Sequence, residues 1–233
     1  FIIKKIYNSC MNKFVPLHII SGYSFLQSGL TIARISDAIK KNEYYGAGLA
    51  DNSAMYGIPE FVQAMDKINK PFIIGMNLVI QNEYVTLFVI SETGYRNLLK
   101  LNSFMQNEEL TFENIKEFKE GIICVLETNK GTFNEKFIEC GDTNTFRKYL
   151  FNISDVFKDN FYLGIEIISS EDKQYAEQVR KFADEYAYEC VAFPSIKYAK
   201  KDDAIVLDIL DAIANKEVIT QKSKEGFEYF MTE

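Results

Sequence analysis

Short apolar runs alternate with amphipathic stretches along the chain. The apolar runs have the length of strands and cover Phe14–Ile20, Gly46–Ala50, Pro71–Ile80, Tyr84–Ile90, Gly121–Leu126, Phe161–Ile168 and Glu189–Phe193. Between them, apolar residues recur every three or four positions over 32–39, 61–68, 95–102, 175–186 and 204–214. This second spacing predicts helices that bury one face. Strands that alternate with helices predict parallel pairing and an α/β fold.

The number of strand-like runs favours a closed barrel over an open sheet. We expect a distorted (β/α)7 TIM-like barrel, in which reactive side chains lie at the C-terminal ends of the strands. The polar triplet Gln81–Glu83 is too short for a helix, so 71–90 is predicted to be a β-hairpin that interrupts the alternation. The region 128–160 has a weak period, and we predict no detailed structure there.

Composition and charge narrow the class of protein. The chain has 233 residues, the size of one domain, and its formal net charge of −7 argues against a main DNA-binding face. No apolar run approaches the ~20 residues of a membrane helix. The four cysteines form no C-x-x-C pair and are expected to be buried or half-buried free thiols in a reducing compartment, which predicts a cytoplasmic protein. They are Cys10, Cys124, Cys140 and Cys190.

Four sequence blocks carry a family resemblance. They are FVPLHIISGYSFLQSGL at 14–30, the segment 49–80 with its LADNSAMYG opening, LFVISETGYRNLLKLNS at 87–103, and the segment 191–219. In this order they resemble the PHP (polymerase and histidinol phosphatase) domain at the N-terminus of bacterial DNA polymerase III alpha subunits. The G-Y-x-N-L piece of the third block is typical of the replicative enzymes rather than of free-standing PHP phosphatases.

The resemblance also implies a division of the chain. Residues 1–10 would be an N-terminal extension or a vector remnant, since Met11 fits a natural start better. Residues 11–219 would form the PHP barrel domain. Residues 220–233 would begin the connection toward a polymerase palm, so we expect the chain to be a truncated part of a longer polymerase.

Active PHP domains, as the resemblance implies, bind up to three divalent ions through histidines, carboxylates and often a cysteine. Two matching positions keep a ligand, namely His18 and Asp51. The others carry Pro16, Ile20, Asn52, Asn77, Ser195 and Lys197. A further expected glutamate is Gly164, although Glu166 would share its face of the strand. We therefore predict a degenerate metal site with no catalytic residue, reduced to a polar cluster of His18, Asp51, Glu166 and Lys197.

Two roles are predicted within that cluster. His18, the only histidine in the chain, would donate a hydrogen bond to Asp51, and Lys197 would serve Asp51 or Glu166 as an internal cation in place of a metal. A Ser-His-Asp triad of Ser21 or Ser24 with His18 and Asp51 is not favoured by the spacing. Neither a P-loop, nor a G-x-G-x-x-G turn, nor a G-x-S-x-G elbow occurs.

The resemblance implies a non-catalytic, structural domain of a replicative DNA-directed DNA polymerase, a nucleotidyltransferase that acts in DNA replication. Its partners would be the remainder of the polymerase chain and a proofreading exonuclease or another replisome subunit, with DNA bound through other domains and no membrane contact. Magnesium would belong to the absent polymerase domain, and at most weak manganese or zinc binding is expected here. The alternatives are a metal-dependent phosphoesterase or 3′–5′ exonuclease of the PHP superfamily, and a free-standing adaptor.

Overall fold

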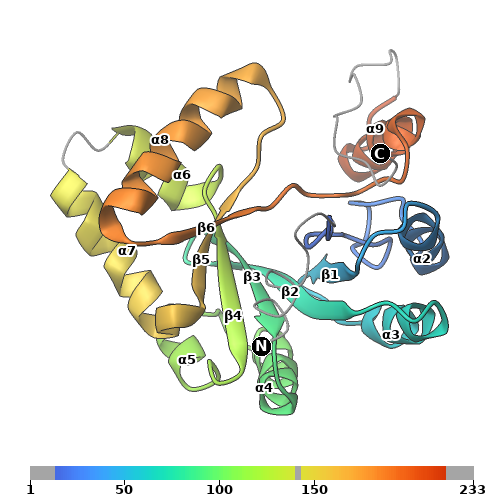
Figure 1. Cartoon of the computed structure of the whole chain (residues 1–233), viewed down its shortest axis with the longest axis horizontal. Helices are drawn as coiled ribbons and strands as arrows, with labels where there is room; N and C mark the ends of the chain where they lie inside the picture. The colour runs from blue at the N-terminus through green and yellow to red at the C-terminus, as the bar shows by residue number, and fades with distance from the viewer. Residues whose placement is uncertain (1–13, 140–142, 219–233) are drawn as a thin grey trace. The chain divides into compact units, whose positions relative to one another are not determined.

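The computed structural model describes residues 14–139 and 143–218, which divide into two compact units (Figure 1). Unit 1 comprises the described residues up to Ile74 and from Ser195 onward, and unit 2 comprises Gly75–Pro194. The expected extension 1–10 and connection 220–233 lie outside the described residues. The strands form one mixed sheet of six, in the order β1-β2-β3-β4-β5-β6. The α/β class predicted from the sequence is therefore confirmed.

Unit 1 is built around β1 (Ala47–Asn52) and the first residues of β2 (Phe72–Ile80). Helices α2 (Ile32–Lys41) and α3 (Ile58–Lys67) cover them, and their apolar faces bury Ile35, Ile39 and Phe61 completely. A short 3-10 turn η2 (Lys201–Ala204) and helix α9 (Ile205–Asn215) end the described part of this unit. The helical periods at 32–39, 61–68 and 204–214 are thus confirmed.

The predicted first strand, 14–20, forms only in part. Ile19 makes isolated parallel bridges with Leu49 and with Ile196. Pro16 has no N–H to donate and contributes only its carbonyl, which accepts the Gly48 N–H at 2.7 Å. The described residues therefore contain six regular strands where seven were expected, and the closed (β/α)7 barrel stays a prediction.

Unit 2 opens with the predicted hairpin, which is confirmed. Strands β2 and β3 (Glu83–Val89) pair antiparallel with Ile80 opposite Glu83, and the two turn residues have φ values of 51° and 65°. These values belong to the type I′ turn, which matches the twist of the two strands. Strand β3 is also antiparallel to β4 (Ile122–Glu127), whereas β4, β5 (Phe161–Ile165) and β6 (Glu189–Ala192) are parallel.

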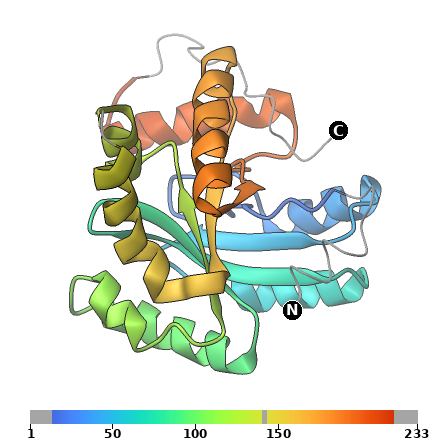
Figure 2. The same ribbon diagram turned by 60° about the vertical axis from the view of Figure 1, so that its left-hand side comes forward.

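The helices of unit 2 include three that the sequence did not predict in detail, at 112–116, 131–139 and 143–157. Their bounds are α4 (Glu92–Phe104), α5 (Phe112–Lys116), α6 (Gly131–Glu139), α7 (Thr143–Phe157), the 3-10 turn η1 (Lys158–Asn160) and α8 (Ser170–Tyr186). Figure 2 shows α6, α7 and α8 grouped beside the β4–β6 strands. Edge-to-face rings join them, with centroids 5.1 Å apart both for Phe133–Phe146 and for Phe146–Phe182. An aromatic core therefore orders much of the region 128–160.

The G-Y-x-N-L block holds helix α4 against the turn that precedes β4. A Cβ atom on Gly94 would lie 1.9 Å from the carbonyl oxygen of Gly121, so only glycine fits this approach. The side-chain amide of Asn97 donates to the carbonyl of Glu120 at 3.0 Å. The helix begins after Ser91, whose hydroxyl accepts the Gly94 N–H, two residues before the expected opening at Thr93. In the part of the chain that the structure describes, no helix is long and apolar enough to cross a membrane.

Candidate functional site

Asp51 is the centre of a buried polar cluster in unit 1. The residue lies near the end of β1 and is 2% exposed. Its Oδ1 accepts the Ser21 N–H at 2.7 Å and the Ser24 hydroxyl at 2.8 Å, and its Oδ2 accepts the Ser21 hydroxyl at 2.8 Å. Burial raises the pKa of Asp51 and outweighs these hydrogen bonds, which lower it. The carboxylate is thus held by uncharged donors.

A tight turn brings the two serines to the carboxylate. The Ser24 N–H donates to the Ser21 carbonyl and the Gln27 N–H donates to the Ser24 carbonyl, each at 3.0 Å. Ser24 also accepts the Asn52 N–H at 2.9 Å, which ties the turn to the end of β1. A Cβ on Gly57 would lie 2.9 Å from Asp51 Oδ2, so the backbone at Gly57 packs directly against the carboxylate.

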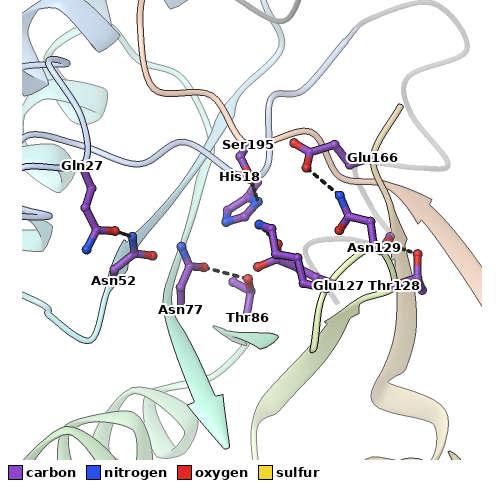
Figure 3. Close-up of polar contacts among 12 residues, drawn as sticks. His18, Gln27, Asn52, Asn77, Thr86, Glu127, Thr128, Asn129, Glu166 and Ser195 are labelled. Carbon is purple, nitrogen blue, oxygen red and sulfur yellow. Dashed lines mark hydrogen bonds and ion pairs between the residues drawn. The ribbon is translucent and has the colours of Figure 1, made fainter. Parts of the chain in front are cut away.

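His18 lies in the same unit and is 2% exposed. Its Nδ1 is 3.3 Å from the hydroxyl of Ser195, which stands where the family resemblance implies a metal ligand (Figure 3). The hydrogen bonds described for the Asp51 carboxylate come from Ser21 and Ser24, so the bond predicted from His18 is not among them. For the same reason, these serines lack the arrangement of a Ser-His-Asp triad, in which the imidazole stands between hydroxyl and carboxylate.

Three further matched positions of unit 1 make packing contacts or hydrogen bonds. Ile20 is buried, at 3% exposure. The Asn52 side-chain amide donates to Gln27 Oε1 (Figure 3). The carbonyl of Lys197 accepts the Ser28 hydroxyl at 3.0 Å. The role of the Lys197 ammonium as an internal cation stays a prediction.

Unit 2 has its own polar cluster at the C-terminal ends of β4 and β5. Glu127 ends β4, and its Oε2 lies 2.5 Å from the ammonium of Lys130. Glu166 follows β5, and its Oε2 accepts the Asn129 amide at 3.0 Å (Figure 3). Both carboxyl groups are buried. Burial lowers the pKa of Lys130, but Glu127 and Glu166 raise it more, so the ammonium stays charged between them.

Sequence reasoning identified Glu166 and missed Glu127 and Lys130. The available signal was the position of Glu127 at the end of the apolar run IICVLE, directly before the turn that carries Lys130. Asn77, which replaces an expected glutamate, pairs with its cross-strand neighbour, since its Oδ1 accepts the Thr86 hydroxyl at 2.7 Å (Figure 3).

The donors of each unit, taken alone, do not fit a divalent ion. Zinc, manganese and iron sites in proteins need several imidazole, thiolate or carboxylate ligands together. Among residues 14–139 and 143–218, no three His, Cys, Asp or Glu side chains are grouped in this way. The oxygens of Asp51 face hydroxyl groups, and those of Glu127 face an ammonium. Of the two cysteines that the structure describes, Cys124 is buried, as predicted, and Cys190 is exposed, both as free thiols, whereas Cys10 and Cys140 lie outside the described residues.

Solved structures with a similar fold include two bacterial proteins. One is an amidohydrolase from Chromobacterium violaceum with bound sulfate and no metal, at a TM-score of 0.54 and 11% identity over 78% of this chain and 87% of that one. The other is a candidate metal-dependent phosphoesterase from Bifidobacterium adolescentis, at a TM-score of 0.50 and 11% identity over 79% and 87%. At this identity the likeness shows the fold alone, in agreement with the α/β class.

The PHP domain family model matches residues 16–168, and the chain belongs to the PHP domain family. Its relatives include the DNA polymerase III subunit alpha of Rickettsia bellii, 30% identical over 215 residues, and that of Bacillus subtilis, 26% identical over 223 residues. These matches cover 87% and 91% of this chain but 18% and 20% of the relatives. The chain thus spans about a fifth of their length, and the resemblance to the polymerase PHP domain is confirmed.

Proposed function

We propose that this chain is the non-catalytic, structural PHP domain of a bacterial DNA polymerase III alpha subunit, acting in DNA replication in the cytoplasm. The observation that carries the proposal is the environment of Asp51, the one carboxylate kept at a matched ligand position. Three uncharged donors from Ser21 and Ser24 occupy its oxygens. A metal ion would compete with these donors, and each buried hydroxyl or amide group that lost its acceptor would cost roughly 1–3 kcal/mol.

The cluster of unit 2 supports the same proposal by its charge. Lys130 lies 2.5 Å from Glu127 and interacts with Glu166, so a positive charge is already supplied to both carboxyl groups. A divalent cation would meet the repulsion of this ammonium as well as the competition of the Asn129 amide. In this proposal Lys130, and not Lys197, serves as the internal cation that was predicted for Glu166.

The partners follow from the length of the relatives. A chain that spans about a fifth of a polymerase subunit is proposed to pack against the remainder of that subunit and to help dock a proofreading exonuclease or another replisome subunit. Nucleotidyl transfer, with its magnesium ions, would belong to residues outside these 233, and DNA would be bound by other domains because this segment carries a net charge of −7. A closed (β/α)7 barrel is the architecture that we propose for the whole domain.

The alternative is a metal-dependent phosphoesterase or 3′–5′ exonuclease. It is favoured by one observation, the survival of buried carboxyl groups at the strand ends, namely Asp51, Glu127 and Glu166. Carboxylates without histidines suit magnesium or manganese better than zinc.

The test is the metal content of the tag-free chain, purified without chelator, offered Mn²⁺, Mg²⁺ or Zn²⁺ and then desalted. We expect elemental analysis to give well under one ion per chain, with Asp51→Asn indistinguishable from the parent chain. One ion per chain that is lost in Asp51→Asn would contradict the proposal and support the alternative, and metal-dependent cleavage of single-stranded DNA would then be measured.

A further inference from the structure

Unit 2 contains a cavity of about 550 Å³ that shares no residue with the two polar clusters. Its walls come from the β2–β3 turn, from α5 and from α7, and Figure 1 shows these two helices side by side. The volume is within the range of sites that bind small molecules, so it has room for one side chain of a partner. The cavity therefore has the size of a recognition pocket.

The titratable groups that line the cavity are mostly acidic. Glu83, Glu113 and Asp155 line it together with one cation, Lys116. The ammonium of Lys116 lies 2.8 Å from Glu113 Oε2, and both side chains are exposed, as is Asp155. An excess of carboxyl groups over ammonium groups makes the cavity attractive to a cation.

Glu83 is the buried member of this set, at 2% exposure. Its Oε2 accepts the N–H of Phe133 in the first turn of α6 at 3.1 Å, and its Oε1 accepts the hydroxyl of Tyr149. Burial raises the pKa of Glu83 to about 7, opposed by the Phe133 N–H, with Glu135 raising it and Lys136 lowering it. The Glu83 carboxyl can therefore gain or lose a proton near neutral pH.

Aromatic rings make up the rest of the recognition chemistry. Phe112, Tyr149 and Phe151 line the cavity, and Phe151 is 57% exposed. A cation already lies over one of these rings, since Lys136 Nζ is 5.2 Å from the centroid of Tyr149. A guanidinium group stacks on aromatic rings and pairs with carboxylates through several N–H groups, which an ammonium cannot do to the same extent.

We propose that this cavity binds the arginine side chain of a partner protein segment, with Glu113 and Asp155 receiving the guanidinium and the aromatic rings covering its planar faces. Glu83 would supply further negative charge at the cavity wall while it still accepts the hydrogen bond from the Phe133 N–H of α6. The inference does not rest on the proposed function, because none of its residues belongs to the strand-end clusters.

The first test compares two ligands of the same shape, of which one is charged and the other neutral. N-acetyl-arginine amide and the neutral isostere N-acetyl-citrulline amide would be titrated into the 233-residue chain, with amide NMR shifts of the α5 and α7 residues as the readout. We expect saturable shifts with the arginine compound and binding at least about tenfold weaker with the citrulline compound, as expected for the loss of charge-assisted hydrogen bonds. Equal binding of the two compounds, or none, would overturn the proposal.

Variants then test the direction of the charge effect. Asp155→Asn should weaken arginine amide binding, and Lys116→Met should strengthen it, because the second change removes a competing cation and frees Glu113. Glu177→Gln, an equal charge change at an exposed site on α8, should leave the affinity unchanged. All three positions are exposed, so each variant is expected to fold. A Lys116→Met chain that binds no more tightly than the parent would argue against the site.

The pH dependence is a third readout. Since a guanidinium keeps its charge throughout, affinity should rise from pH 6 to pH 8 as Glu83 loses its proton, and the citrulline compound should show no such trend. An affinity for arginine amide that falls over this range would contradict the role of Glu83.

Discussion

Two buried carboxyl groups, Asp51 and Glu83, accept hydrogen bonds from hydroxyl and main-chain N–H groups in the described structure. Such donors satisfy the oxygens without supplying a full compensating charge, so the ionised form stays costly and the pKa of both groups is raised. At the residue scale, each carboxyl group is therefore a point where pH and stability are linked.

Ser21→Ala should destabilise the chain by about 1–3 kcal/mol at pH 7, because it removes the hydroxyl that bonds both oxygens of the buried Asp51. The free energy of unfolding in urea is the measurement. Ser36→Ala is the control, since its exposed hydroxyl bonds only the Ala33 carbonyl in the same helix. Equal losses in the two variants would show that the Asp51 cluster adds nothing to stability.

Glu83→Gln should remove a pH-dependent component of stability. The pKa of a glutamate is ~4.5 when unfolded and about 7 here, so the folded state holds this proton more tightly. The stability that the Glu83 proton contributes is fully present below the unfolded-state pKa. As the pH rises through the folded-state pKa, this contribution of about 3 kcal/mol is lost. The variant should gain on the parent chain by up to that amount between pH 4.5 and pH 8 in urea unfolding. A difference in unfolding free energy between the two chains that stays constant with pH would refute the raised pKa of Glu83.

At the element scale, the attachment of helices depends on a few small or polar residues. Helix α4 is held by Gly94 and Asn97, and α8 begins with a capping box formed by Ser169 and Asp172. The first pair explains in physical terms why the G-Y-x-N-L block has its spacing. The glycine permits the close approach, and the asparagine, one turn further, bonds the facing carbonyl.

Gly94→Ala tests this account. Alanine favours a helix over glycine by about 1 kcal/mol, yet its Cβ would meet the Gly121 carbonyl at 1.9 Å. We expect a net loss of more than about 2 kcal/mol, since overpacking forces the backbone to shift. Thr93→Ala, at the exposed neighbouring position, should change stability by less than about 0.5 kcal/mol. A stabilised Gly94→Ala chain would contradict the close contact.

The sequence predicted the elements with strong periodicity and missed those without it. The hairpin was evident because three polar residues cannot form a crossover helix. Helix α7 was missed although Phe146, Leu150, Ile153 and Phe157 are buried at helical spacing. The aromatic residues Tyr149 and Phe151 lie off this buried face, since Tyr149 is half-buried and Phe151 is exposed. They therefore weaken the helical spacing of apolar residues in the sequence.

The candidate site was predictable in its residue types and not in its contacts. A single histidine and the substitutions around it are read directly from the sequence, and Asp51 and Glu166 were identified by matching. The bonds of Asp51 to Ser21 and Ser24 depend on a tight turn whose geometry the sequence does not reveal. The pairing of Lys130 with Glu127 depends on where β4 ends, and strand boundaries are the least certain part of a sequence-based prediction.

At the scale of the whole molecule, the net charge of −7 predicts poor DNA binding. We expect no measurable association of the chain with a 20-base-pair duplex by fluorescence anisotropy at micromolar protein and about 0.15 M salt. A full-length polymerase of the same family would serve as the positive control. Association that weakens steeply with salt would instead reveal a basic face and assign this segment a direct part in holding DNA.

The two-residue turn between β2 and β3 has a consequence for the order in which the chain acquires its structure. A hairpin closes in about 1–10 μs because its partners are neighbours in sequence. The parallel pairs, such as Cys124 with Phe161, must wait until α6 and α7 have been laid down between them, and closing such a long loop is entropically slower. On the ribosome, the hairpin β2–β3 can therefore be assembled first and present a preformed edge onto which β4, β5 and then β6 are added as each emerges.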